Sequence, residues 1–398
     1  MIIELHLLQS FPVSNLNRDD IGQPKTVRFG GVTRARISSQ SLKRAARELF
    51  TSHGLETGDI GRRTKQLPER AGILLAERGK CEVGRAQLVA QEALAAFGFG
   101  VTEDRGRSEY LLYVGPAAVE HLADYCEKRW GILEKALEKE EKRKADAKKA
   151  SRTKVKPTQK ELIEARKVFD SSRVADIALF GRMIADNQDF SVISASQVAH
   201  SISTHAVANE FDFYTAMDDM RPAEEPAADM MGTIDYNAAC YYRYANLDTD
   251  RLLRNLFGEE SVPPEELSTE DKALLVRSVR AWLRAFVHAV PRGKQNSMAA
   301  PTVPDVLLGV ARTDGAWSLA NAFLSPVGDV ADLMDTSARR MTGYFDQIRD
   351  FYGDEELRGV HYGSLDPSGG LSDRQPRGCQ EAKGIDAFVE GLIGSAGL

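Results

Sequence analysis

The chain has 398 residues, of which 42% are hydrophobic and 28% charged, and this is the composition of a folded globular protein. Its 52 Lys and Arg residues against 58 Asp and Glu residues give a net charge of −6, which excludes a globally basic nucleic-acid binder, so any site for a polyanion must be a local patch. No apolar run is long enough to cross a bilayer, and the N-terminus lacks the basic start of a signal peptide, so we expect a cytoplasmic protein with no membrane contact. The four cysteines form no C-x-x-C pair, so we expect them to be free thiols.

The first 25 residues predict a strand and a long loop. Residues 2–8 alternate in the manner of a strand, and the polar stretch 10–25 follows. The loop carries Arg18 and Lys25. Because two aspartates directly follow Arg18, the local pattern favours an ion pair there over contact with a ligand.

The most informative stretch is residues 27–50. Residues 32–37 alternate as a half-buried strand does, and Ser38 and Ser39 stand where a helix N-cap is expected. The residues that follow recur at helical spacing. The apolar side of this predicted helix consists of Leu42, Ala45, Ala46 and Leu49, and its polar, outward side consists of Gln40, Lys43 and Arg47.

The start of this helix predicts an anion site. The first N–H groups of a helix lack intrahelical partners, and the helix dipole favours negative charge at that end. We expect Arg34 and Arg36 to add positive charge from the preceding strand. Residues 1–50 hold eight Lys and Arg residues against four acids, a local charge of +4. This density favours the anion site over an ordinary capped helix with a solvated basic face.

Residues 55–170 are predicted to be helical, with a short strand at 110–114. Within them, the segment 135–160 carries eleven Lys and Arg residues against four acids, a balance of +7. A solvated charged face and non-specific capture of a nucleic-acid backbone both remain open for this segment.

The middle of the chain returns to β-structure. The helical pattern ends at Gly181, and residues 197–207 alternate as a strand. This would place His200 and His205 on opposite faces and makes them poor candidates for one metal site. The long acidic insertion 207–240 is unusual for a solvated loop because it holds aromatic residues and methionines. We expect it to contact a ligand.

The last third predicts strands at 239–247 and 303–310, helices at 268–290 and 331–351, and a peripheral tail. Lys294 follows Gly293 as in a P-loop, but the rest of that motif is missing. The order of elements fits the split β-α-β-β-α-β plan of the RNA-recognition fold. No catalytic motif is visible, so we expect no catalytic residues, no metal and no cofactor.

Seven motifs occur in one order along the chain. They are L-N-R-D-D (16–20), F-G-G-x-x-R-x-R-I-S-S-Q-S-L-K-R-A-x-R (29–47), D-I-A-L-x-G-R-M (176–183), A-H-S-I-S-T-H (199–205), F-Y-T-A-M-D-D (213–219), Y-R-Y-A-N (242–246) and P-x-G-K-Q (291–295). Together they resemble the CasC family, the backbone subunit of the type I-E CRISPR Cascade complex. The C-terminal quarter carries none of these motifs.

The resemblance implies an α+β fold shaped as a right hand. An RNA-recognition-like (ferredoxin-like) palm would comprise residues 1–55, 172–206 and 241–398. Helical fingers would comprise residues 56–171, and a long β-hairpin thumb residues 207–240.

The resemblance also implies a function. Copies of the subunit would stack along the spacer of the CRISPR RNA, together with other Cascade subunits, and present it for base pairing with target DNA. Thumbs would displace one nucleotide at regular intervals. The subunit itself would not be an enzyme.

Several residues acquire roles through the resemblance. The implied RNA-binding residues are Arg18, Lys25, Ser38, Gln40, Lys43, Arg47, Met183, Phe213 and Lys294. Met183 would wedge beside a base, with the cation Arg182 next to it, and Tyr214 would join Phe213 in the thumb. A lysine-rich finger helix would hold target DNA through Lys139, Lys142, Lys144, Lys148 and Lys149.

Two other functions remain in competition. One is a stand-alone RNA-processing endonuclease on a related fold, for which His6, His200 and His205 are the best-placed acid/base candidates. The other is a phosphate-binding regulatory domain that uses only the serine–helix turn.

Overall fold

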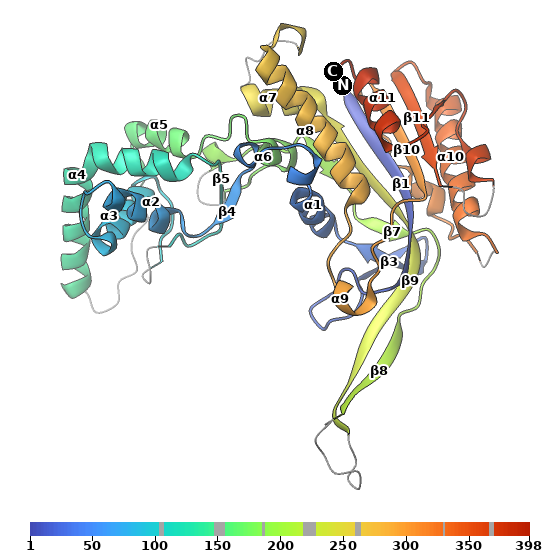
Figure 1. The fold of residues 1–398 in the computed structure, drawn as a ribbon, viewed down its shortest axis with the longest axis horizontal. Helices are drawn as coiled ribbons and strands as arrows, with labels where there is room; N and C mark the ends of the chain where they lie inside the picture. Colours follow the sequence, from blue (N-terminus) through green and yellow to red (C-terminus); the bar gives the residue numbers. More distant parts are fainter. Residues whose placement is uncertain are drawn as a thin grey trace. The chain divides into compact units, whose positions relative to one another are not determined.

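The computed structural model describes residues 1–102, 107–146, 156–184, 188–217, 228–258, 264–328, 331–365 and 370–398. The fold is α+β, as the sequence predicts (Figure 1). The chain divides into two compact units. The sheet unit comprises residues 1–54, 196–250 and 266–398, and the helical unit comprises residues 55–195 and 251–265. Residues 172–195 and 251–265 thus group with the helices, whereas the sequence-based division assigned them to the palm.

A ten-stranded sheet forms the centre of the sheet unit, within the part of the chain that is described. Its order is β12-β11-β10-β1-β9-β7-β3-β2, and β6 and β8 also pair with β9. The strands are β1 (Ile2–Ser14), β2 (Thr26–Phe29), β3 (Val32–Ile37), β6 (Ser196–Val198), β7 (Ser201–Ser203), β8 (Glu210–Met217), β9 (Ala228–Asp248), β10 (Val306–Arg312), β11 (Leu357–Ser364) and β12 (Gln380–Glu381). The single strand expected at 197–207 is therefore two short strands separated at Ala199 and His200.

Helices cover both faces of this sheet. The helices of the sheet unit are α1 (Ser39–Glu48), α8 (Thr269–His288), α9 (Gln295–Met298), α10 (Leu333–Tyr352) and α11 (Ile385–Ser395), with 3₁₀ turns at Thr51–His53, Leu319–Phe323 and Leu371–Arg374. A further 3₁₀ turn, Pro264–Glu266, lies where the chain passes from the helical unit to the sheet unit. In β10, Leu308 packs in one core with Phe345 of α10, whereas Gly309 lies against Leu392 of α11. Successive residues of a strand point to opposite faces, so both faces are buried here, and even the polar residues Glu4, His6 and Gln9 of β1 are fully buried.

The predicted hairpin is present and belongs to the sheet unit. Strand β8 pairs antiparallel with the first part of β9, from Glu210 opposite Tyr236 to Met217 opposite Ala228. Strand β9 then continues without a break into the central sheet, where it pairs with β1 up to Asp248 (Figure 1). One strand therefore forms part of both the hairpin and the core.

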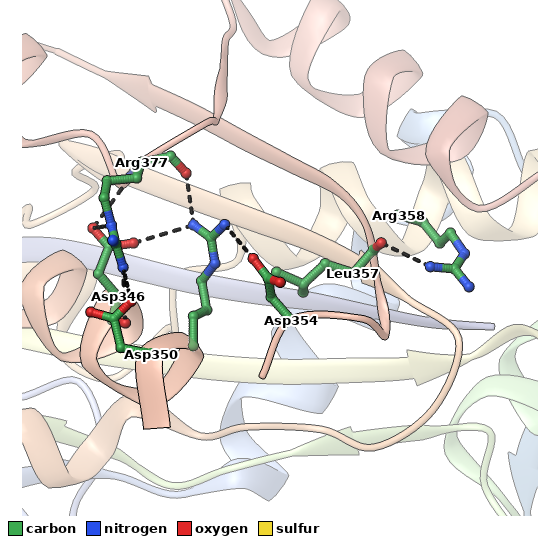
Figure 2. A network of polar contacts seen from close by, with 7 residues as sticks. Asp346, Asp350, Asp354, Leu357, Arg358 and Arg377 are labelled. Carbon is green, nitrogen blue, oxygen red and sulfur yellow. Dashed lines mark hydrogen bonds and ion pairs between the residues drawn. The ribbon is translucent and has the colours of Figure 1, made fainter. Parts of the chain in front are cut away.

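The end of α10 is tied to the segment that leads to the edge strand β12. Arg349 donates to Asp354 at 2.9 Å, to Asp346 at 3.3 Å and to the carbonyl oxygen of Arg377 at 2.7 Å. The Arg377 guanidinium in turn reaches Asp346 and Asp350 (Figure 2). Since several charges share partners, this network holds its side chains at a lower entropic cost than isolated surface pairs would.

The helical unit packs around its own apolar core. Its elements are β4 (Arg62–Thr64), α2 (Leu67–Glu77), α3 (Val83–Ala96), β5 (Leu112–Val114), α4 (Ala118–Asp146), α5 (Gln159–Val168), α6 (Ala175–Phe180), most of α7 (Thr249–Phe257), and 3₁₀ turns at Thr57–Asp59 and Gln188–Phe190. Leu94, Phe97, Leu122 and Phe169 belong to that core. Within the described ranges, no helix is long and apolar enough to cross a membrane.

Candidate nucleic-acid interface

The start of α1 is a capped helix end, as predicted. Ser38 has extended backbone angles (φ −69°, ψ 144°), and its Oγ accepts from the N–H of Ser41 at 3.4 Å. The N–H of Ser38 donates to Oδ1 of Asn17 at 2.8 Å. Asn17 therefore joins the long loop after β1 to the helix start, and this brings Arg18 and Lys25 into the same part of the sheet unit.

His200 accepts a hydrogen bond from one of the N–H groups at the start of α1, where the sequence predicts an anion site. The N–H of Ser39 donates to Nδ1 of His200 at 3.2 Å, and Nη1 of Arg36 lies 3.4 Å from the same nitrogen. The N–H of Gln40 has no acceptor among the described residues. No local pattern points to this role, because His200 is 161 positions from Ser39.

Arg34 is not part of the basic surface, which corrects the expectation from the alternating strand. The side chain is fully buried and donates to the carbonyl oxygens of Phe29 at 3.3 Å, Ser203 at 3.0 Å and Phe323 at 2.7 Å. Burial, and then the charge of Arg340, lowers the pKa of Arg34. The guanidinium can satisfy three carbonyl groups at once, so it fixes β3 in place instead of facing solvent.

The polar face of α1 is only partly turned outward. Gln40 is exposed, whereas Lys43 and Arg47 are half-buried, and burial lowers the pKa of Lys43. The fully outward cation is Arg44, which pairs with Glu48 at 3.1 Å. Lys43 and Arg47 therefore lie on the flank of the helix with their stems against the protein.

Arg18 is exposed, and the expected local ion pair is absent within the described chain. Oδ1 of Asp19 instead accepts from the backbone N–H groups of Ile21 at 3.1 Å and Gln23 at 2.9 Å. Such a turn is a common use of aspartate. It leaves the guanidinium of Arg18 available to an outside ligand.

Lys294 lies on a loop that is fixed against the strand end before Arg18. Gln295 donates to the carbonyl oxygen of Pro291 at 3.1 Å and accepts from the N–H of Ala300 at 3.0 Å. Lys294 itself has a left-handed backbone with φ 51°. Gly293 approaches Leu16 closely, so the P-x-G-K-Q motif forms a rigid loop and not a phosphate-cradling P-loop.

Contacts within the sheet unit join the segments that carry these residues, and we call the residues together the basic patch. It comprises Arg18, Lys25, Arg36, Gln40, Lys43, Arg47, His200 and Lys294. Asn17 links the loop to α1, and Arg292 links the Lys294 loop to Glu48 of α1 at 3.1 Å. Within a chain of net charge −6, this patch is a local cationic surface of the kind that binds a polyanion.

The hairpin carries exposed apolar side chains. Phe211 and Phe213 are 73% and 57% exposed and share a face with Met231, because residues two apart on a strand point the same way and Met231 pairs with Thr215. Tyr214 is on the other face, over Gly232. Exposed aromatic rings can stack on bases.

Met183 belongs to the helical unit and is 90% exposed, as expected for a presented side chain. The cation beside it is not part of a ligand surface, however. Arg182 is buried and donates to the carbonyl oxygens of Phe190 at 2.9 Å, Phe169 at 2.8 Å and Tyr113 at 3.2 Å. Arg182 therefore anchors the segment from which Met183 projects.

The lysines proposed for DNA binding are only partly covered by the structure. Lys139 and Lys142 are exposed on the C-terminal half of α4, and the backbone of Lys144 continues that helix. Lys148 and Lys149 lie outside the described residues.

Two of the three histidines considered as acid/base candidates have structural roles. His6 is fully buried, with Nδ1 2.9 Å from the hydroxyl of Tyr242. In His205, Nε2 accepts from the N–H of Cys240 at 3.3 Å, and Nδ1 is 2.9 Å from the carbonyl oxygen of Ala206. Both nitrogens of His205 are thus occupied, and His6 cannot reach a ligand.

Comparison with known proteins adds independent findings. Residues 3–389 match the model of a family described as CT1975-like protein, and a search of curated proteins finds no significant match. A solved chain described as "CRISPR RNA-guided surveillance complex, pre-nicking" is 27% identical with a TM-score of 0.80, and 100% of each chain is covered. A chain described as "CRISPR RNA-guided surveillance complex" is 24% identical with a TM-score of 0.70, again over 100% of both chains, and shows a shared fold.

Proposed function

The chain belongs to the CT1975-like protein family, and from this premise we propose that it is the CRISPR RNA-binding backbone subunit of a type I-E Cascade surveillance complex. The observation that carries the proposal is the likeness, over the whole of both chains, to a chain of a CRISPR RNA-guided surveillance complex. The CasC motifs in the sequence support the same assignment.

In this proposal the basic patch holds the sugar–phosphate backbone of the guide. Contacts to phosphates position a nucleic acid without reading its bases. The bases of the guide therefore stay free to pair with target DNA, whatever the spacer sequence. Copies of the subunit stack along the spacer, so the number of phosphate contacts grows with the length of the RNA. Other Cascade subunits complete the complex in the cytoplasm.

The exposed apolar residues have a separate part in the proposal. Met183 unstacks one base of the guide, and the hairpin face with Phe213 offers a stacking surface. Lys139 and Lys142 attract the backbone of target DNA. We propose that the subunit needs no metal or cofactor and cleaves neither RNA nor DNA. The burial of His6 and the occupied nitrogens of His205 weaken the competing endonuclease.

The test is coexpression with the neighbouring genes, followed by identification of the copurified nucleic acid and by binding assays with RNAs of increasing length. We expect a CRISPR RNA to copurify, and affinity and cooperativity to rise with RNA length. Equal affinity for short and long RNAs would point to the phosphate-binding domain. RNA cleavage that is lost in His200→Ala would point to the endonuclease.

A further inference from the structure

His200 joins three parts of the basic patch. It lies between β6 and β7, and its Nδ1 is close to the N–H of Ser39 in α1 and to the guanidinium of Arg36 in β3. The side chain is exposed to solvent. None of the family motifs or local patterns assigns it a contact with RNA.

The hydrogen bonds of the ring determine its tautomer. Ser39 and Arg36 both offer N–H groups to Nδ1, and an N–H group can only donate, so Nδ1 must present its lone pair. In a neutral imidazole the proton is then on Nε2. No residue in the described ranges accepts a hydrogen bond from this Nε2–H.

The ring is neutral near pH 7. Although the side chain is exposed overall, partial burial of the ring, followed by the charges of Arg36 and Lys25, lowers the pKa of His200. A second proton would also have to sit on Nδ1, where two donors already point at it. His200 therefore presents one uncharged, oriented donor amid the cations of the basic patch.

We propose that Nε2–H of His200 donates a hydrogen bond to a phosphate oxygen of the guide RNA. The inference rests on the proposed function and adds a contact of a different kind. The N–H of Ser39, which a bound anion would otherwise use, is engaged by Nδ1, and the imidazole offers a donor farther out in its place. The remaining contacts of the patch come largely from Lys and Arg, whose strength depends on salt.

Two substitutions separate the two nitrogens of the ring. In His200→Asn, the side-chain oxygen can take the place of Nδ1 and keep the bond from Ser39, but the outer donor is lost. In His200→Gln, the longer side chain places an amide N–H near the position of Nε2. Melting temperatures of both variants show whether the sheet unit is intact.

We expect His200→Asn to melt as the parent does and to bind guide RNA about tenfold more weakly, because a hydrogen bond to a charged group is lost. His200→Gln should recover most of that loss. The slope of log K against log salt should stay that of the parent in both variants, since a neutral donor releases no counterion. A slope reduced by about one would mean a charged contact and overturn the proposal.

The sugar provides the last control. The loss in His200→Asn should persist on a DNA guide of the same sequence, because DNA has the same phosphates but no 2′-hydroxyl. A loss seen only with RNA would assign the contact to the ribose and overturn the phosphate assignment, as would unchanged binding by His200→Asn. A parent protein that binds no RNA at all would instead contradict the proposed function.

Discussion

Gly293 packs directly against the backbone of Leu16, with no room for a side chain between them. A Cβ added at Gly293 would come within 2.5 Å of the carbonyl oxygen of Asn15 and even closer to that of Leu16. This contact sets the position of Lys294 relative to the loop that carries Arg18. The glycine of the P-x-G-K-Q motif thus serves close packing between two segments of the basic patch.

Gly293→Ala should push the Lys294 loop away from β1. We expect a loss of roughly 1–3 kcal/mol in the free energy of unfolding, as for other overpacked sites, and weaker RNA binding. Urea denaturation and RNA titration measure the two effects. Gly343→Ala in α10 is the matched control, because nothing lies near its Cβ position and alanine favours the helix. Equal behaviour of the two variants would contradict the role of the Leu16 contact.

Lys43→Ala should weaken binding to guides of every sequence alike. Because Lys43 is proposed to contact a phosphate, the salt slope of binding should fall by about one ion. Arg339→Ala, which removes a cation from the exposed side of α10, is the control and should leave the slope unchanged. A loss restricted to one guide sequence would show that Lys43 reads a base.

Met183→Ala should leave stability within about 0.5 kcal/mol of the parent, because the side chain is exposed. In the assembled complex, however, the guide–target duplex should lose its periodic pattern of displaced bases. Chemical probing of the hybrid on the protein detects this change. Ile193→Ala, another exposed apolar residue of the helical unit, should keep the pattern. A uniformly protected duplex on the parent would rule out the wedge.

The double variant Lys139→Gln and Lys142→Gln should slow association with duplex target DNA at low salt and leave assembly with the guide intact. Electrostatic steering acts mainly on the association rate and fades as salt rises. Stopped-flow binding at several salt concentrations measures it. Lys272→Gln with Lys383→Gln removes the same charge from exposed positions of the sheet unit and is the control. Equal association rates for the two double variants would show that the lysines of α4 only face solvent and do not attract DNA.

Stability should decrease as the pH falls below about 6.5. Burial lowers the pKa of five histidines: His53, His200, His205, His288 and His361. Above the ordinary value of 6.5 these rings are neutral in both states. Below it, the unfolded chain binds protons that the folded chain does not, so unfolding becomes more favourable. Thermal melts between pH 7.5 and pH 5.5 measure the trend, and a flat or rising melting temperature would contradict it.

The sequence predicted those parts of the site that depend on neighbouring residues. The strand at 32–37, the Ser38 cap and the apolar side of α1 all follow from spacing over a few residues, and the structure confirms them. The end of the helical pattern at Gly181 is also confirmed, since Gly181 has a φ of 75° and follows α6 directly.

The errors concern residues whose surroundings come from distant parts of the chain. Arg34 is held by carbonyl groups 169 and 289 positions away, and His200 meets α1 across 161 positions. The prediction that Arg182 is a cation beside the ligand was wrong for a similar reason, since one of its carbonyl acceptors, in Tyr113, is 69 positions away. An arginine in an alternating pattern looks solvated unless the carbonyl groups that surround it are known, and these depend on the tertiary fold.

The length of β9 has a consequence for how this chain can vary through insertions and deletions. A single inserted residue within Ala228–Asp248 would turn every following side chain to the opposite face. In the central sheet, where both faces are covered, it would put Arg243, which donates to the carbonyl oxygen of Phe286 in α8, on the face where Tyr242 now packs, so that neither face could pack as it does. An addition to the hairpin that keeps the register must therefore come in pairs, one residue in β8 for each residue in β9.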